Sequence, residues 1–218
     1  MISLLRAMLL ALSSTLAVIP NGFTYLASLA PQIRQDIRYA TPDNFTGARV
    51  PGYDAPACIL TTPAAKALLR VERTLLTHYL TLRVYDCHRP ESAVDAFLAW
   101  SKRPTNLRDE ALYYPNVPKS ALFARGYISE RSAHSRGSTV DLTIDGLAMG
   151  TPYDYFDPLS RGDAPVPTQA RANRMFLAML MERYGFKPYP AEWWHFTLVR
   201  EPFPKRSFNF PITAQHSR

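Results

Sequence analysis

Proline is the feature of this sequence that most restricts its fold, because the chain contains 19 prolines and only 9 glycines. Proline lacks a backbone N–H and its ring fixes φ, so it is excluded from helix interiors and central strands. Most of these residues must therefore lie in loops or at the starts of helices. The sequence predicts short elements joined by long, rigid connections.

Length and charge narrow the class of protein further. The chain has 218 residues, of which 47% are hydrophobic and 20% charged, a balance typical of one globular domain. Its net charge is +7, but the basic residues are scattered without a run of five or six, so no nucleic-acid partner is expected. The excess of positive charge would favour binding to an anionic cell-wall or membrane surface. The sequence does not indicate an oligomeric state.

Residues 1–22 have the pattern of a signal peptide. A positive charge at Arg6 precedes the charge-free residues 7–19, and Pro20 breaks the segment directly afterwards. This stretch is shorter than the ~20 residues needed to span a bilayer, so no stable membrane anchor is expected. An amphipathic first helix is disfavoured because residues 7–19 have no polar face. We predict an exported, periplasmic protein, cleaved between about residues 17 and 22 and beginning near Val18, whose catalytic domain spans residues 23–218.

Cys58 and Cys87 are the only cysteines, and both follow the predicted leader. Export to an oxidising compartment favours a disulfide between them. Two buried thiols are an alternative, and so is Cys87 as a metal ligand. A lone cysteine, however, lacks the paired spacing of thiolate zinc sites.

Hydrophobic periodicity predicts an α+β fold. Helices are expected from Thr62 to near Tyr79, from Arg89 through Trp100, and from Thr168 to Tyr184. Strands are expected at 82–84, at 140–145 with one face buried, and at 193–199, with a strand end in 39–47. A long surface loop or short helical turns are expected at 102–131, and a loop at 151–167. Since the spacing is not a regular βαβ repeat, we predict a single domain with a small central antiparallel sheet, flanking helices and long loops.

The predicted helices have specific starts and buried faces. Thr62 is expected to cap the first helix, with Pro63 in its first turn. The apolar stripe of the first helix comprises Ala64, Leu68, Leu75, Leu76 and Tyr79. The second helix is expected to turn Val94, Phe97 and Leu98 inward. The last helix has an apolar face made of Met175, Phe176, Ala178, Met179 and Leu180.

Two histidines and a carboxylate form the most informative constellation. His134 and Asp141 lie seven residues apart, and His195 follows near the C-terminus. Two histidines plus one carboxylate make a catalytic zinc set, with a fourth position for water. Seven extended residues would span about 23 Å, so the chain must turn back between His134 and Asp141. Gly137, which can adopt positive φ, is the expected bend.

Two further residues have suitable chemistry for this site. Glu192 lies three residues before His195, so on a bend both can face one cleft, where the carboxylate can accept a proton as general base. Arg89, between a strand and a helix, can stabilise an oxyanion or a substrate carboxylate.

Each residue also has an ordinary structural explanation. A single His134 is usually a satisfied core or surface histidine, Asp141 could face water from an amphipathic strand, and Arg89 could be a surface charge. Trp193, Trp194 and Phe196 are expected mainly as core aromatics. No function is expected for His78, His216 or His88.

The combination resembles one known family. Ser-x-His-x-x-Gly-x-x-x-Asp at 132–141, followed by Glu-x-Trp-His at 192–195, is similar to the zinc D-alanyl-D-alanine dipeptidases of the vancomycin-resistance (VanX) type. Further similar segments lie at 36–41, 44–45, 85–86, 89–90, 149–150 and 201–202, so the resemblance covers roughly Phe23 to Ile212. One departure is Thr139, where the family usually has alanine.

The resemblance implies an activity and a set of roles. It implies one zinc ion on His134, Asp141 and His195, with Glu192 as base and Arg89 stabilising the tetrahedral intermediate. It also implies that Ser132 and Asp154 bind the ammonium group of a small dipeptide. By position alone, Asp154 would be a solvated turn carboxylate.

Two other functions remain open at this point. One is a D,D-carboxypeptidase acting on longer wall peptides, for which an ammonium-binding Asp154 in a closed cavity would be unfavourable. The other is a non-catalytic wall-binding module with structural zinc, against which the intact Glu192 argues. The predicted cysteine pair and leader distinguish the chain from a cytoplasmic resistance enzyme, so its expected role is cell-wall peptide turnover.

Overall fold

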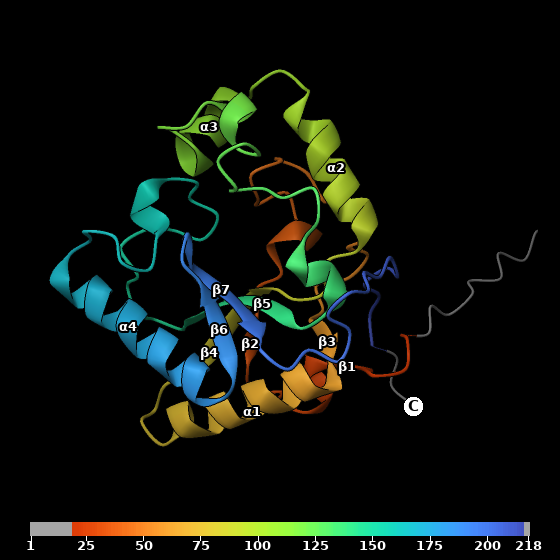
Figure 1. Cartoon of the computed structure of the whole chain (residues 1–218), viewed down its shortest axis with the longest axis vertical. Coiled ribbons are helices and arrows are strands. Elements are labelled where there is room, and N and C mark those ends of the chain that lie inside the picture. The colour runs from red at the N-terminus through yellow and green to blue at the C-terminus, as the bar shows by residue number, and fades with distance from the viewer. Residues whose placement is uncertain (1–18, 216–218) are drawn as a thin grey trace, which may run out of the picture.

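Two β-sheets organise the computed structural model, which describes residues 19–215 (Figure 1). The smaller sheet pairs β1 (Phe23–Tyr25) with β3 (Ile59–Thr61) in antiparallel orientation. The larger sheet has the strand order β2-β4-β5-β7-β6. Its strands are β2 (Arg34–Gln35), β4 (Leu82–Asp86), β5 (Thr139–Ile144), β7 (Glu192–Leu198) and β6 (Phe186–Tyr189). Its edge strand β2 runs parallel to β4, and the other pairs are antiparallel. The predicted α+β class is confirmed, with one parallel pair in a sheet expected to be antiparallel.

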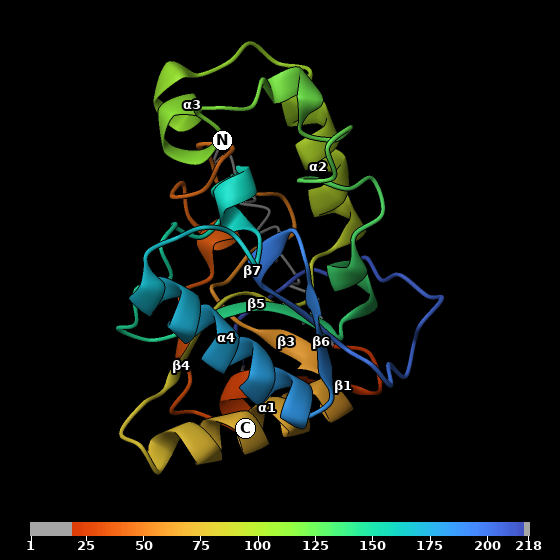
Figure 2. The ribbon, with the colours of Figure 1, turned by 60° about the vertical axis from the view of Figure 1, so that its left-hand side comes forward.

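Within the described residues, four α-helices surround the sheets. They are α1 (Thr62–Leu76), α2 (Glu91–Ser101), α3 (Leu107–Tyr113) and α4 (Thr168–Arg183). In Figure 1, α1 lies along the bottom, α4 on the left, and α2 and α3 at the top. Figure 2 shows α4 and α1 on the same side of the molecule, away from α2 and α3. Among the described residues, no helix is long and apolar enough to cross a membrane.

Prolines lie where the sequence predicted them. Pro63 occupies the first turn of α1, while Pro90 and Pro167 directly precede α2 and α4. Pro188 lies in β6, an edge strand of the larger sheet, where a missing N–H is tolerated.

Strand β5 differs from the prediction of one buried face. All six residues from Thr139 to Ile144 are buried, because β4 and β7 flank the strand and the sheet is covered on both faces. Of the alternating polar residues, Asp141 lines the cavity described below, whereas Asp145 forms ion pairs with Arg34 and Arg83. Asp141 in particular does not face water.

Helix α1 ends before Tyr79, contrary to the prediction. Tyr79 adopts φ +58°, a left-handed conformation that cannot continue the helix, and its side chain is fully exposed. Leu76 is also exposed, so both residues were wrongly assigned to the apolar stripe. Thr62 is the first helical residue, and the preceding Thr61 makes no capping hydrogen bond with its side chain, so the predicted Thr62 cap is also wrong.

Helix α4 buries a different face from the predicted one. Met175, Phe176 and Met179 are exposed, whereas Arg174 is buried. The reason is tertiary, since the Arg174 guanidinium donates hydrogen bonds to the backbone oxygens of Met149, Leu159 and Arg161 and to Thr151 Oγ1. These bonds hold the loop that carries Asp154.

Two loop segments contain short helical turns, one of them unexpectedly. The strand end predicted in 39–47 is instead a 3-10 turn over Arg38–Ala40 followed by a loop. Asn44 stabilises that loop by hydrogen-bonding several backbone oxygens with its side-chain amide. The segment 102–131 contains α3 and a 3-10 turn at Lys119–Ala121, which agrees with the short helical turns expected there.

The structure contains the predicted disulfide between Cys58 and Cys87, with a Cα–Cα distance of 5.3 Å. It ties the start of β3 to the end of β4, across a sequence separation of 29 residues. The alternatives of free thiols or a Cys87 metal ligand are therefore wrong.

Reducing this disulfide should lower the free energy of unfolding by about 3 to 4 kcal/mol, because a cross-link of this span restricts the unfolded chain. Intact-mass measurement with alkylation, before and after reduction, reports the thiol state. Denaturant unfolding of both forms gives the stability difference. Two alkylated thiols in the native protein would contradict the pairing.

Candidate active site

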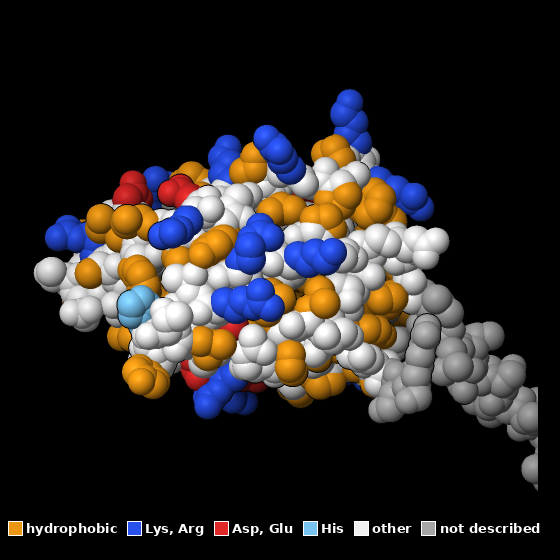
Figure 3. Space-filling model, turned by 90° about the horizontal axis from the view of Figure 1, so that it is seen from below, with side chains coloured by type: hydrophobic (Ala, Val, Ile, Leu, Met, Phe, Trp, Pro, Cys, Tyr) orange, Lys and Arg blue, Asp and Glu red, His pale blue; other side chains and the backbone are white. Residues whose placement is uncertain are grey.

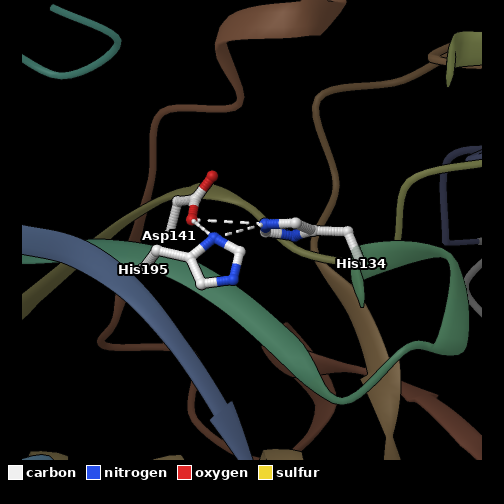
Figure 4. A group of neighbouring side chains, drawn as sticks. All are labelled: His134, Asp141 and His195. Atoms are coloured by element: carbon white, nitrogen blue, oxygen red, sulfur yellow. Dashed lines mark hydrogen bonds and ion pairs between the residues drawn. The ribbon is translucent and has the colours of Figure 1, made fainter. Parts of the chain in front are cut away.

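Three donor side chains converge from separate elements. His134 comes from a 3-10 turn (Ala133–Arg136), Asp141 from β5 and His195 from β7. Asp141 Oδ1 lies 3.2 Å from His134 Nε2 and 3.1 Å from His195 Nδ1, and the two nitrogens are 3.3 Å apart (Figure 4). The predicted turn back of the chain is thus present.

Local backbone geometry explains this convergence. Gly137 ends the 3-10 turn with φ +79°, and a Cβ atom there would lie 2.1 Å from Phe23 Cε1. Only glycine fits this position, so the bend falls where it was predicted. After the bend, Asp141 pairs directly with His195 in the β5–β7 register.

The donor set suits a divalent metal ion. His134 Nδ1 donates a hydrogen bond to the Cys87 carbonyl oxygen at 2.8 Å, which leaves the lone pair of Nε2 facing the site. Asp141 Oδ2 accepts a hydrogen bond from Tyr153, whereas Oδ1 is buried without a donor among the described residues. A cation between these three atoms would satisfy that oxygen.

Protonation also suits metal binding. Burial alone would raise the pKa of Asp141, but His134 and His195 hold that pKa below its ordinary value, so the carboxylate is ionised. Burial lowers the pKa of His195 although Asp141 opposes the effect, which favours the neutral ring. Metal ligands need these two states.

Glu192 reaches the same site from the start of β7. On a regular strand, residues three apart point to opposite faces. Here the β6–β7 register shifts between Pro188 and Tyr189, and Glu192 Oε2 lies 3.5 Å from His195 Nδ1. Burial, together with Asp141 and Asp154, raises the pKa of Glu192 well above its ordinary value. A more basic carboxylate is a better proton acceptor.

Arg89 lies beside the site with its side chain 13% exposed, so it is not an ordinary surface charge. Its Nε and Nη2 donate to Asp86 Oδ2 at 2.9 and 2.8 Å, and Nη2 lies 3.7 Å from Asp141 Oδ2. Burial is the largest single influence and opposes the charged form, but Asp86 together with Tyr39, Tyr53 and Tyr153 outweighs it, so the pKa of Arg89 is raised well above its ordinary value. A permanent cation therefore lines the cavity.

Asp154 and Ser132 lie in the same cavity wall. Asp154 is buried, which contradicts the solvated turn expected from position alone, and it accepts a hydrogen bond from Tyr39 at 2.9 Å. Burial and the charge of Asp141 raise its pKa to about 8. Ser132 Oγ accepts a hydrogen bond from the His134 backbone N–H, so it also supports the turn that carries this histidine.

The cavity around these groups has a volume of about 610 Å³. All seven predicted metal, catalytic and substrate-binding residues line it. Aromatic rings complete its wall, namely Tyr39, Phe45, Phe97, Tyr127, Phe156, Tyr189 and Trp194. Trp193, Trp194 and Phe196 are buried, as predicted for core aromatics.

Sequence reasoning gave no role to Asp86 and Tyr153. Asp86 is fully buried and accepts hydrogen bonds from Tyr53, Arg89 and the Cys87 backbone. Tyr153 donates to Asp141. The spacing of Asp86 three residues before Arg89 was a usable signal for an ion pair, whereas Tyr153 had no signal beyond its position next to Asp154.

The remaining histidines lie outside the donor set. His88 is buried and stacks on Phe210, and burial lowers its pKa to about 4. His78 is exposed after α1. His216 lies outside the described residues. Thr139, the departure from the family pattern, is buried and pairs its hydroxyl with that of Thr197 at 2.8 Å.

Two histidines, an aspartate and a buried glutamate, gathered in one cavity of an α+β fold, define a metallopeptidase-type site. The D-Ala-D-Ala dipeptidase model of the M15 peptidases matches residues 20–213. The chain belongs to this family.

The chain is similar to curated relatives along most of their length. The chain is 44% identical over 199 residues to the D-alanyl-D-alanine dipeptidase of Streptomyces coelicolor, covering 88% of this chain and 98% of the relative. It is 40% identical over 200 residues to that of Enterococcus faecalis, covering 88% and 99%. The Escherichia coli dipeptidase is 31% identical over 179 residues, covering 79% and 82%.

Proposed function

We propose that the protein hydrolyses D-alanyl-D-alanine, or closely similar D,D-dipeptides, with one zinc ion, in cell-wall peptide turnover. The observation that carries the proposal is the convergence of three metal donors beside Glu192 in one cavity. Family membership supports the substrate class, since the curated relatives above are D-alanyl-D-alanine dipeptidases.

His134, Asp141 and His195 would hold the zinc ion. When bound there, zinc would polarise the scissile carbonyl and lower the pKa of water. Two hydrogen bonds keep the donors in place, from His134 to the Cys87 carbonyl and from Tyr153 to Asp141. Such supporting contacts orient metal ligands and keep their lone pairs available.

The other site residues supply proton transfer and charge stabilisation. Glu192 takes the proton of the attacking water and returns it to the leaving amine. Arg89, held by Asp86, stabilises the negative charge that develops on the carbonyl oxygen. No covalent bond between substrate and enzyme is needed. The position of Glu192 beside the donors argues against a non-catalytic wall-binding module.

Asp154 is proposed to bind the substrate ammonium, with help from Ser132. In the free protein, burial raises the pKa of Asp154 to about 8. An arriving ammonium group brings the opposite charge and favours the ionised carboxylate. This contact distinguishes a dipeptidase from a D,D-carboxypeptidase, whose substrates carry an acylated amine at the corresponding position.

The test compares D-Ala-D-Ala with N-acetyl-D-Ala-D-Ala on the wild type and on Asp154→Asn. A charge-assisted hydrogen bond contributes about 1.5 to 3 kcal/mol, so the substitution should lower kcat/KM for the free dipeptide about ten- to a hundredfold. It should barely change the poor cleavage of the acetylated peptide.

Zinc content and the melting temperature of Asp154→Asn serve as controls, since the amide keeps the shape of the side chain. Equal or better cleavage of the acetylated peptide by the wild type would assign the protein to the carboxypeptidases.

We also propose that the protein is exported to the periplasm. Residues 1–18 lie outside the described residues, so the support comes from the charge-free segment and from the disulfide, which is typical of an oxidising compartment. The Gly22 carbonyl accepts a hydrogen bond from Thr62, and Ile19 packs against the core. These contacts favour a cleavage site before Ile19.

N-terminal sequencing of protein recovered from the periplasm should accordingly find a start near Val18. Cleavage after Gly22 would remove the carbonyl that Thr62 uses, and should destabilise the protein. Recovery of the chain with Met1 intact would contradict export by a cleaved leader.

A further inference from the structure

The exposed face of α1 is basic along its length. Lys66, Arg70 and Arg73 recur at helical spacing and are all exposed. None of the three forms an ion pair with a described residue. Unpaired like charges on one helix face repel one another, so the arrangement favours an anionic partner.

No acidic side chain interrupts this face. The one acidic residue of α1, Glu72, is fully buried. Its carboxylate accepts hydrogen bonds from the Thr81 hydroxyl and the Leu82 backbone N–H, so it serves the packing of α1 on β4. Figure 3, seen from below, shows Lys and Arg side chains gathered in the middle of this side of the molecule, with few acidic ones visible.

A shallow pocket lies within the basic face. It has a volume of about 290 Å³ and is lined by Arg70, Arg73, Thr74, Thr77 and Tyr184. The Arg70 guanidinium lies over the Tyr184 ring, 5.9 Å from its centroid, and the Thr74 and Tyr184 hydroxyls are 2.6 Å apart. Two guanidinium groups beside hydroxyls match the chemistry of a phosphate group.

Apolar side chains project at the end of the same helix. Leu76 is 45% exposed and Tyr79 is 100% exposed. Tyr79 also holds φ +58°, a conformation that is sterically unfavourable for a residue with a Cβ atom. This backbone conformation closes the end of α1, since the N–H groups of Tyr79 and Leu80 donate to the carbonyls of Leu76 and Leu75, but no contact of the fold accounts for the fully exposed ring. Beside a row of cations, it matches the interfacial aromatic anchors of membrane-binding surfaces.

We propose that the α1 face, defined as Lys66, Arg70, Arg73, Leu76 and Tyr79, docks the protein on a membrane of anionic phospholipids. The cations contact the phosphate headgroups, with one headgroup in the pocket beside Tyr184. Tyr79 and Leu76 enter the interface between headgroups and acyl chains. A soluble polyanion would use the cations but would leave these two side chains exposed to water.

The proposal does not depend on the peptidase reaction. None of the five residues lines the cavity that contains His134 and Glu192. Docking would hold the enzyme at the membrane surface without changing its active site.

Vesicle co-sedimentation tests the proposal, with phosphatidylcholine vesicles compared with vesicles containing phosphatidylglycerol. Each basic residue near an anionic surface contributes about fivefold to partitioning, so Lys66→Gln/Arg70→Gln/Arg73→Gln should weaken binding on the order of 100-fold. Tyr79→Ser should weaken binding while leaving its salt dependence unchanged. All variants are compared in the same N-terminal form, established by sequencing, so that any leader contributes equally.

The matched control is Lys102→Gln/Arg108→Gln/Arg125→Gln, which removes the same charge from three exposed positions. Lys102 directly follows α2, Arg108 lies in α3, and Arg125 lies in the loop after α3. It should bind like the wild type. Both triple variants should retain dipeptide hydrolysis and their melting temperature, which establishes that they are folded.

Three results would overturn the proposal. One is no preference of the wild type for phosphatidylglycerol, and another is equal loss of binding in the two triple variants. The third is full retention of binding by Tyr79→Ser together with equally tight binding of the wild type to soluble polyphosphate, which would identify a soluble polyanion as the partner.

Discussion

Glu192→Gln should keep the metal ion but lower kcat for D-Ala-D-Ala by about 10² to 10⁴-fold, the usual contribution of general acid–base catalysis. The amide preserves the size of the side chain but cannot accept a proton as a carboxylate does. Because Glu192 is buried, with a pKa raised by burial and by Asp141 and Asp154, its basicity is the property that the substitution removes.

The experiment needs both kinetics and metal analysis. Metal content per chain should equal that of the wild type, since Glu192 is not among the three donors that converge. Glu182→Gln, at an exposed position on α4, provides a matched control and should leave kcat unchanged. Loss of the metal from Glu192→Gln would instead indicate that this residue is a ligand, and unchanged kcat would exclude it as the base.

The convergence of His134, Asp141 and His195 was predictable because the family resemblance implied the set and residue spacing limited the geometry. His134 and Asp141 can share one ion only if the chain reverses between them, and Gly137 was the residue able to do so. The structure has that reversal, and a side chain at Gly137 would collide with Phe23. The rule about glycine thus predicted the bend between His134 and Asp141, whereas the addition of His195 to the set rested on the family resemblance.

The surroundings of the site were less predictable, because they depend on tertiary contacts. Asp86 accepts a hydrogen bond from Tyr53, 33 residues away, and Tyr153 donates one to Asp141, 12 residues away. Sequence periodicity carries no information on such pairs. The same limit explains Asp154, which position alone assigned to solvent and which the fold buries against Tyr39.

Hydrophobic periodicity predicted where helix α4 lies but not which of its faces is buried. Apolar periodicity identified α4, but Met175 and Met179 are exposed while Arg174 is buried. Arg174 is buried because it hydrogen-bonds the carbonyls of the loop carrying Asp154. A helix that supports an active-site loop can thus bury a polar side chain, and hydrophobic patterning cannot anticipate it.

His134→Ala and His195→Ala should each lose the metal, and with it essentially all turnover. Removing a supporting partner of a metal ligand typically costs 10- to 100-fold in affinity, so removing a ligand itself should cost more. Direct measurement of zinc per chain, after equilibration with a competing chelator, gives the loss without reference to activity. His78→Ala removes an exposed histidine and should keep the wild-type zinc content.

Thermal unfolding separates loss of the ion from loss of the fold. A ligand that binds the native state stabilises it by RT ln(1 + [L]/Kd), about 4 kcal/mol at a thousandfold excess over Kd, so zinc should raise the melting temperature of the wild type. The two ligand variants should melt cooperatively but show no increase with zinc. His134→Ala should also melt lower than His195→Ala without metal, because only His134 is hydrogen-bonded to the Cys87 carbonyl at the disulfide. A full zinc-dependent increase in either variant would remove that histidine from the metal site.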